Sequence, residues 1–220
     1  DHAQFTALLQ KLMSPEADVR TPAEEAYDNV PAGTRVPLLL AIMRGGENEM
    51  VRTMAAVLLR RVFTSSFEEF WPALQEQQKQ ELRQQMLKAI QDEPTDLMRR
   101  KMAECTAEFA RNMIDEEGNN TWPDVLKFMF ESVKSEQAGM QEAALHIFSV
   151  VPGIFGNSQG NYINVIKELL KRDIHFDSVC MKDASGTTDP KTLFELAKGL
   201  KRILPPEVFL WQHTHDTASM

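Results

Sequence analysis

The sequence is poor in cysteine and contains no long hydrophobic run. Only two of its 220 residues are cysteine, Cys105 within a helical pattern and Cys180 within a polar stretch. So few cysteines argue against a disulfide framework and for a reducing compartment. No apolar stretch approaches the roughly 20 residues that cross a bilayer, and the opening residues DHAQFTALLQ lack a basic segment followed by an apolar one. We therefore expect a cytosolic or nuclear protein without membrane insertion.

Recognisable catalytic and metal-binding motifs are also missing. The chain has no Gly-rich phosphate loop, HExxH pair, CxxC or GxSxG, so we expect a protein that is not an enzyme and that uses no cofactor. His213 and His215 form a short HTH, which is typical of a solvated segment and not of a metal site. The loop that begins at Asp115, DEEGNNTW, lacks the spaced ligands of a calcium loop. His146, within AALHIF, is interpreted as a packed helical residue.

Positive charge is in deficit. Lys and Arg number 24 against 32 Asp and Glu, which gives a net charge of −8. This balance disfavours nucleic acid and anionic membranes as partners and favours basic proteins. The short basic clusters at 60–61 and 99–101 lack the interleaved aromatic residues of a nucleic-acid surface. We therefore expect a protein-binding module with no direct nucleic-acid contact.

Apolar residues recur at helical spacing almost throughout the chain up to residue 170, and no alternating strand pattern is evident. Thr21, Pro22 and Glu24 in TPAE predict the start of a helix, as a cap, a first helical position and a capping box. A strongly apolar helix is predicted at 48–64. The other expected helices cover 4–13, 35–43, 74–91, 95–114, 122–134, 136–151 and 159–171.

A repeat emerges when the second helix of each predicted pair is aligned. ADVRTPAEEAY, EMVRTMAAVLL, DLMRRKMAECT and AGMQEAALHIF share an apolar anchor that is usually followed by Arg, and the anchors Val19, Val51, Met98 and Met140 are 32, 47 and 42 residues apart. A period of about 40 with two helices per unit is typical of HEAT and armadillo arrays. The sequence thus predicts an all-α, right-handed α-α superhelix, with a single helical bundle as the competing fold.

The repeats also suggest a domain organisation. Residues 1–171 are expected to form an array of about four and a half helical hairpins, and residues 172–220 a divergent tail. Within the tail, a helix at 189–204 has an apolar face that could cover the open end of the array. That face consists of Leu193, Leu196, Ala197, Leu200 and Leu204.

Several segments resemble the amino-terminal part of the importin-β (karyopherin-β) family of nuclear transport receptors. They are VRTMAAVLLRRVFTSSFEEFWPAL, AEEAYDNVP, AEFARNMIDEEGNNTWPDVLKFMFESV and EAALHIFSVVPGIFGN, and the likeness covers about residues 4–171. The resemblance implies a receptor that binds Ran-GTP through the inner helices of its first repeats. It also implies basic cargo such as ribosomal proteins and histones, nucleoporins as further partners, and a location in both cytoplasm and nucleus.

The resemblance assigns a candidate Ran-binding surface to the polar sides of the inner helices. Its residues are Glu24, Asp28, Arg60, Arg61, Glu104, Glu108 and Arg111. Salt bridges between neighbouring repeats explain the same charges equally well.

Three departures from the family pattern leave a second interpretation open. Pro22 falls where the family helix continues, so the first inner helix is expected to start late. Gln141 replaces the Arg that follows the other anchors, which is expected to weaken a ladder between repeats. The tail after residue 171 matches no familiar continuation. The alternative is a HEAT-repeat scaffold without a transport role, or a truncated isoform that has lost Ran and cargo binding.

Overall fold

The computed structural model describes residues 2–115, 118–151, 154, 159–171, 177–183 and 190–214. The chain divides into two compact units, Asp1–Ile154 and Phe155–Met220. The division therefore falls before the helix at 159–171, and not after it as the sequence suggested. The reason is that this helix, α10 (Gln159–Lys171), contacts α11 (Pro190–Lys201) of the second unit.

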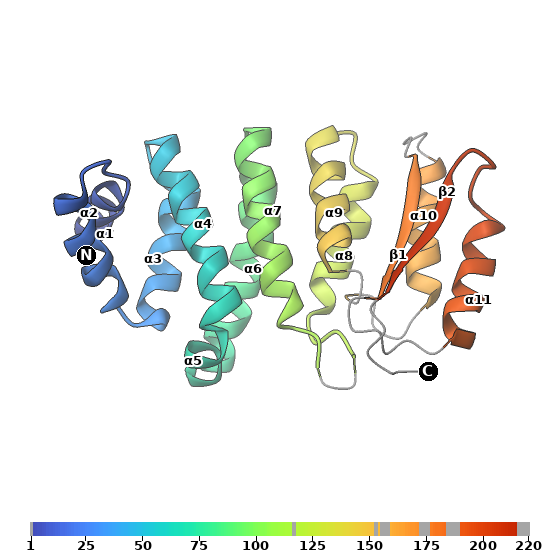
Figure 1. Ribbon diagram of the computed structural model, residues 1–220, viewed down its shortest axis with the longest axis horizontal. Helices are drawn as coiled ribbons and strands as arrows, with labels where there is room; N and C mark the ends of the chain where they lie inside the picture. Colours follow the sequence, from blue (N-terminus) through green and yellow to red (C-terminus); the bar gives the residue numbers. More distant parts are fainter. Residues whose placement is uncertain are drawn as a thin grey trace. The chain divides into compact units, whose positions relative to one another are not determined.

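Unit 1 consists of antiparallel helical hairpins (Figure 1). The hairpins pair α1 with α2, α3 with α4, α6 with α7 and α8 with α9. The short α5 (Phe67–Phe70) and a 3-10 turn η1 (Trp71–Ala73) follow α4. The bounds are α1 His2–Leu12, α2 Ala17–Asp28, α3 Ala32–Gly45, α4 Glu49–Ser65, α6 Glu76–Asp92, α7 Asp96–Arg111, α8 Pro123–Val133 and α9 Ala138–Val150.

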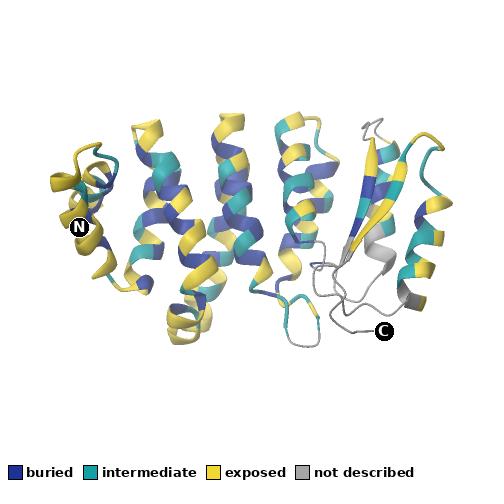
Figure 2. Ribbon diagram, viewed as in Figure 1, coloured by how far each residue is buried: buried dark blue, intermediate teal, exposed yellow. Residues whose placement is uncertain are grey.

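The hairpins stack through one row of helices. The helix α4 packs on α7, and α7 packs on α9. The anchors of this row, Val51, Met98 and Met140, are all buried, and Figure 2 shows buried residues on the helix sides turned toward neighbouring helices. Each hairpin thus buries its apolar side against the next hairpin, because a single hairpin cannot bury that surface by itself, as in a solenoid.

The first hairpin departs from this pattern. Its anchor Val19 is 37% exposed, and α1, not α2, makes the principal contacts with α3 and α4. The predicted start of α2 at Thr21 is also wrong. The helix begins at Ala17, with Glu16 as its N-cap, and Pro22 lies inside it. Because Pro22 is exposed and lies in the second turn, it removes one backbone hydrogen bond on the solvent side without breaking the helix.

The polar residue after each anchor has the same role in all four repeats. Its side chain donates a hydrogen bond to a backbone carbonyl near the turn that precedes its own helix, where helix-end carbonyls lack partners. Gln141 therefore makes the same hydrogen bond within its hairpin that the arginines make in theirs. This bond lies inside one repeat, so the predicted weakening of contacts between repeats does not concern it. The donor–acceptor pairs are Arg20–Ser14 (3.0 Å), Arg52–Met43 (2.9 Å), Arg99–Glu93 and Gln141–Ser135 (2.8 Å).

An aromatic cluster joins the second, third and fourth hairpins. Phe109 of α7 lies at its centre, with ring centroids 5.0 Å from Phe63, 5.4 Å from Trp71 and 5.2 Å from Trp122. Phe67 adds a further edge contact at 5.9 Å. Tilted and edge-on rings at these distances add stabilisation beyond their buried area. Phe67 and Trp71 of the FEEFWPAL step therefore connect the end of the second hairpin to α7 of the third through Phe109.

Unit 2 contains structure that the helical pattern did not predict. Strands β1 (Ser178–Asp183) and β2 (Phe209–Thr214) form a parallel two-stranded sheet. Between them in sequence lies α11, within the range where a helix was expected, and it contacts both α10 and β2. In β1, Val179 and Met181 are buried. Two alternating apolar residues were too weak a signal to indicate a strand.

Candidate functional site

Of the predicted residues on α4 and α7, Arg60 and Glu104 form an ion pair that crosses from one repeat to the next. The Arg60 guanidinium is 3.0 Å from the Glu104 carboxylate, and the Lys101 ammonium lies 3.0 Å from the same carboxylate. Arg60 is about half exposed, whereas the Glu104 side chain is only 18% exposed. Glu104 therefore acts as the connecting anion, and Arg60 presents the more accessible charge.

Further ion pairs lie along α7 and between α7 and α9. Together with Arg60, Lys101 and Glu104 they form what is here called the charged row. Glu108 and Arg111 form an ion pair of 3.7 Å, and Arg111 also donates to the Val150 carbonyl at 3.5 Å. Arg100 pairs with Glu142 of α9. Sequence reasoning missed Arg100, Lys101 and Glu142 as members of this surface. Their positions two or three residues after an anchor, on the exposed side of the same helices, were the available signal.

The candidates on α2 have a different environment. Glu24 pairs with Arg20 of its own helix at 3.5 Å. Asp28 and Arg61 both act electrostatically on the buried Tyr27, and the Arg35 guanidinium lies 4.9 Å from the centre of its ring. Burial raises the pKa of Tyr27 above its usual value, and the Asp28 carboxylate adds to this effect while the arginines oppose it. The structure thus brings Asp28 and Arg61 near one residue but ties Glu24 to α2.

His146 of α9 is half-buried within the same charged row. Burial lowers its pKa, and the neighbouring Arg100 and Lys101 act in the same direction, while Glu104 and Glu142 oppose them. The imidazole is therefore neutral at pH 7. The interpretation as a packed helical residue holds for its half-buried position, but the residue also borders the charged surface.

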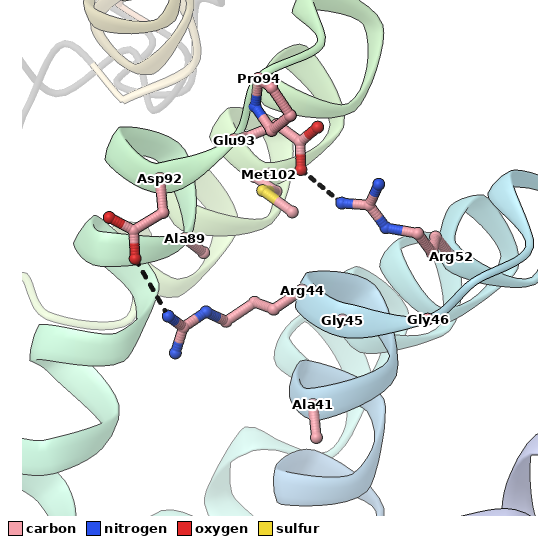
Figure 3. A pocket seen from close by; sticks show the side chains of 10 residues that line it. All are labelled: Ala41, Arg44, Gly45, Gly46, Arg52, Ala89, Asp92, Glu93, Pro94 and Met102. Carbon is pink, nitrogen blue, oxygen red and sulfur yellow. Dashed lines mark hydrogen bonds and ion pairs between the residues drawn. The ribbon is translucent and has the colours of Figure 1, made fainter.

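A second set of ion pairs connects the ends of the second and third hairpins. Arg44 and Asp92 lie 3.3 Å apart, and Arg52 pairs with the buried Glu93. Figure 3 shows the two pairs on either side of a pocket of about 600 Å³, which is lined from both hairpins. Each cation in the pocket already faces an anion, so the pocket carries little net charge for a ligand to recognise.

Among these charged groups, the Glu93 carboxylate has both hydrogen bonds from Thr95 and an ion pair with Arg52. Burial by itself raises the pKa of its carboxyl, but hydrogen bonds from the Thr95 hydroxyl and backbone N–H, together with Arg52, outweigh burial and lower the pKa below its usual value. The carboxylate is therefore charged near neutral pH and connects α4 to the start of α7.

The buried thiol of Cys105 is poorly suited to nucleophilic chemistry. Burial raises the pKa of the Cys105 thiol to about 12, so its nucleophilic thiolate form is scarce at neutral pH. Within the described ranges, no three His, Cys, Asp or Glu residues gather as a metal site requires. No helix in these ranges is long and apolar enough to cross a membrane. His215 lies outside the described residues, and His213 is exposed.

Comparisons with known proteins point to one family. The family described as "IPO5-like, TPR repeats" matches residues 94–185. Importin-4 of Mus musculus is 25% identical over 182 residues, which are 80% of this chain and 16% of that protein. A probable importin-5 homolog of Dictyostelium discoideum is 23% identical over 197 residues, 88% of this chain and 17% of that protein. The chain thus spans about a sixth of the length of these relatives.

Solved structures agree with the fold. Kap121p aligns with a TM-score of 0.61 and 19% identity over 93% of this chain and 18% of its own. Kap121p bound to RanGTP aligns with a TM-score of 0.60 and 19% identity over 91% of this chain and 20% of its own. At such identity the likeness speaks for the fold alone, and it confirms the predicted helical solenoid.

Proposed function

We propose that the chain belongs to the importin-β family and is the part of a nuclear import receptor that binds Ran in its GTP form. The observation that supports this proposal is the stacked row of helices α4, α7 and α9, in which ion pairs join charged side chains of neighbouring repeats. Arg60, Arg61 and Arg111 present exposed cations on this row. A partner with matching charges would be steered to it and held in register.

Further partners of the proposed receptor follow from the same relatives. Kap121p has been crystallised bound to RanGTP, to Pho4p and to Nup53p. We propose that the receptor from which this chain derives carries basic proteins, such as ribosomal proteins and histones, contacts nucleoporins, and moves between cytoplasm and nucleus. The net charge of −8 favours basic cargo.

Binding to Ran loaded with GTP or GDP tests the first proposal. We expect the chain to retain Ran loaded with a non-hydrolysable GTP analogue at least tenfold more tightly than Ran-GDP. The double variant Arg60→Glu, Arg111→Glu is expected to lose that preference, because it reverses two exposed charges of the row. Lys88→Glu, an exposed lysine of α6, is the matched control for a change of charge. Equal or absent binding of both nucleotide forms would overturn the proposal.

A second candidate function has an observation of its own. Val19 is exposed and α2 is not the principal contact with the second hairpin, so Glu24 and Asp28 belong to a hairpin that joins the array differently. We propose as the alternative a scaffold that uses the same array without binding Ran. Chemical cross-linking in lysate that recovers a specific partner other than Ran, combined with no nucleotide-dependent binding, would favour this alternative.

A further inference from the structure

The strand β2 has an open edge. Within the described residues it pairs with β1 alone, in parallel register. The backbone N–H of Phe209 donates to the Asp177 carbonyl, and in a parallel ladder alternate residues turn both of their backbone groups to the same edge. Phe209 and Trp211 therefore bond to β1, whereas the N–H and C=O groups of Leu210 and Gln212 point to the open edge.

This edge lacks the features that protect an open strand. Natural edge strands are commonly shielded by charged side chains, above all Lys, by Pro, by a bulge or by being very short. The six residues of β2, FLWQHT, include no Lys, Arg, Asp, Glu or Pro. The other strand, β1, ends with Lys182 and Asp183. An uncharged open edge is a template on which another extended strand can pair.

Two aromatic side chains lie on one face of β2. Phe209 is 75% exposed and Trp211 is 57% exposed, and Figure 2 shows most of β2 as exposed. They are two residues apart and therefore point to the same side of the sheet. The opposite side is the one that unit 2 buries, since Val179 and Met181 of β1 are buried there. The two rings therefore contribute little to the core of their own unit.

The distribution of charge favours a second copy of the chain as the occupant of this edge. Unit 2 has eight Lys and Arg residues and eight Asp and Glu residues, whereas unit 1 has 16 and 24. The net charge of −8 thus resides in unit 1, and two copies of unit 2 can meet without net repulsion. A strongly charged partner segment would find no opposite charge along FLWQHT.

We propose that two copies of the chain associate by antiparallel pairing of their β2 strands, which joins two sheets of two strands into one of four. A two-fold axis at Trp211 gives the matching register. It pairs Leu210 with Gln212 of the second copy, so that the outward backbone groups of both residues are hydrogen-bonded. It also places the two Trp211 residues opposite each other as a non-hydrogen-bonded pair, with Cα atoms about 4.5 Å apart.

This register uses both the backbone edge and the aromatic face. Aromatic side chains directly opposite each other on neighbouring strands stabilise a sheet. The contact is nevertheless small, because two aromatic side chains bury roughly 300–500 Å² per copy, less than the roughly 800 Å² per partner of a standard interface. We therefore expect a weak dimer, with a Kd of about 10–100 μM. This inference does not depend on binding to Ran.

Sedimentation equilibrium of the whole chain over a range of concentrations around that Kd tests the proposal. The average mass is expected to rise from 25.0 kDa towards twice that value. Trp211→Lys is expected to weaken association at least tenfold, because it brings two like charges together at the two-fold axis.

A second variant leaves both aromatic side chains in place. Gln212→Pro removes an N–H group from the open edge but none of the bonds to β1, and Pro is tolerated at such a position. It is expected to weaken association by a similar factor. The matched control is Phe194→Lys on α11, which also replaces an exposed aromatic residue of unit 2 (63% exposed) by a cation. It should associate like the wild type. Circular dichroism verifies that each variant is folded.

Each other result would overturn the inference. A wild type that stays monomeric means that the edge is left open or is covered by an extended segment of a different protein. A dimer that persists in both Trp211→Lys and Gln212→Pro uses another surface. Loss of the dimer in Trp211→Lys alone would show stacking of aromatic faces without strand pairing, and loss in Phe194→Lys would place the contact on α11. None of these results bears on the proposed function.

Discussion

The first hairpin and the three that follow it share a sequence pattern but not a packing arrangement. Val51 and Met98 are buried between stacked helices, whereas Val19, at the equivalent position, remains partly exposed. The difference arises because the first hairpin meets its neighbour through α1 and not through α2. The comparison teaches that a repeat pattern specifies the hairpin itself, while the contacts of each helix depend on which neighbour is present.

The largest difference is expected at the anchors themselves. Met98→Ala should lower the free energy of unfolding by about 2–5 kcal/mol, because it leaves a cavity at a fully buried site. Val19→Ala should change it by only about 0.5 kcal/mol or less, as for an exposed position. Urea denaturation of unit 1 measures both values. Equal losses for the two variants would contradict the distinction between the hairpins.

The buried carboxylate of Glu93 gives the next effect. Its pKa is lowered in the folded state, so its stabilisation is present above the pKa of the unfolded chain and is lost as pH falls through the folded value. Glu93→Gln should cost about 1–3 kcal/mol at pH 7 by leaving Arg52 and Thr95 poorly matched. It should also reduce the loss of stability on acidification. Unfolding free energies measured from pH 7 down to about pH 3 test this, and parallel curves for variant and wild type would refute it.

The smallest effect concerns the polar residue after each anchor. Gln141→Ala should cost about 1 kcal/mol, since the Ser135 carbonyl loses its donor. Arg20→Ala should cost less, because Ser14 and Pro15 lie at an open turn where water replaces the guanidinium. Thermal unfolding monitored by calorimetry ranks the two variants. The reverse order would show that the first hairpin depends on its turn more than its neighbours do.

Most of the helices could be predicted from the sequence because each has an apolar face with regular spacing. The helix expected at 48–64 is α4, Glu49–Ser65, and that at 159–171 is α10 with the same bounds. The start of α2 was mispredicted because Thr21, Pro22 and Glu24 form a plausible local cap. Instead, the backbone N–H groups of Val19 and Arg20 donate to the Glu16 carbonyl, and the helix begins one turn earlier.

The candidate site was less predictable than the fold. Arg60 and Glu104 were identified by resemblance. Their ion pair depends on the packing of α4 against α7, and local sequence patterns do not predict which helices pack together. The exposure of Met50 and Val57 was equally hidden, since their spacing is that of any amphipathic helix. Which side of α4 remains uncovered is decided by the hairpins on either side.

The most direct measurement of the central claim is amide hydrogen exchange of the chain with and without Ran bound to a GTP analogue. Added protection is predicted within Glu49–Ser65 and Asp96–Arg111, the helices α4 and α7 that carry the charged row. The partner helix α6, Glu76–Asp92, should change little. Protection confined to α6 and α8, or none on any helix, would contradict the assignment of the binding face.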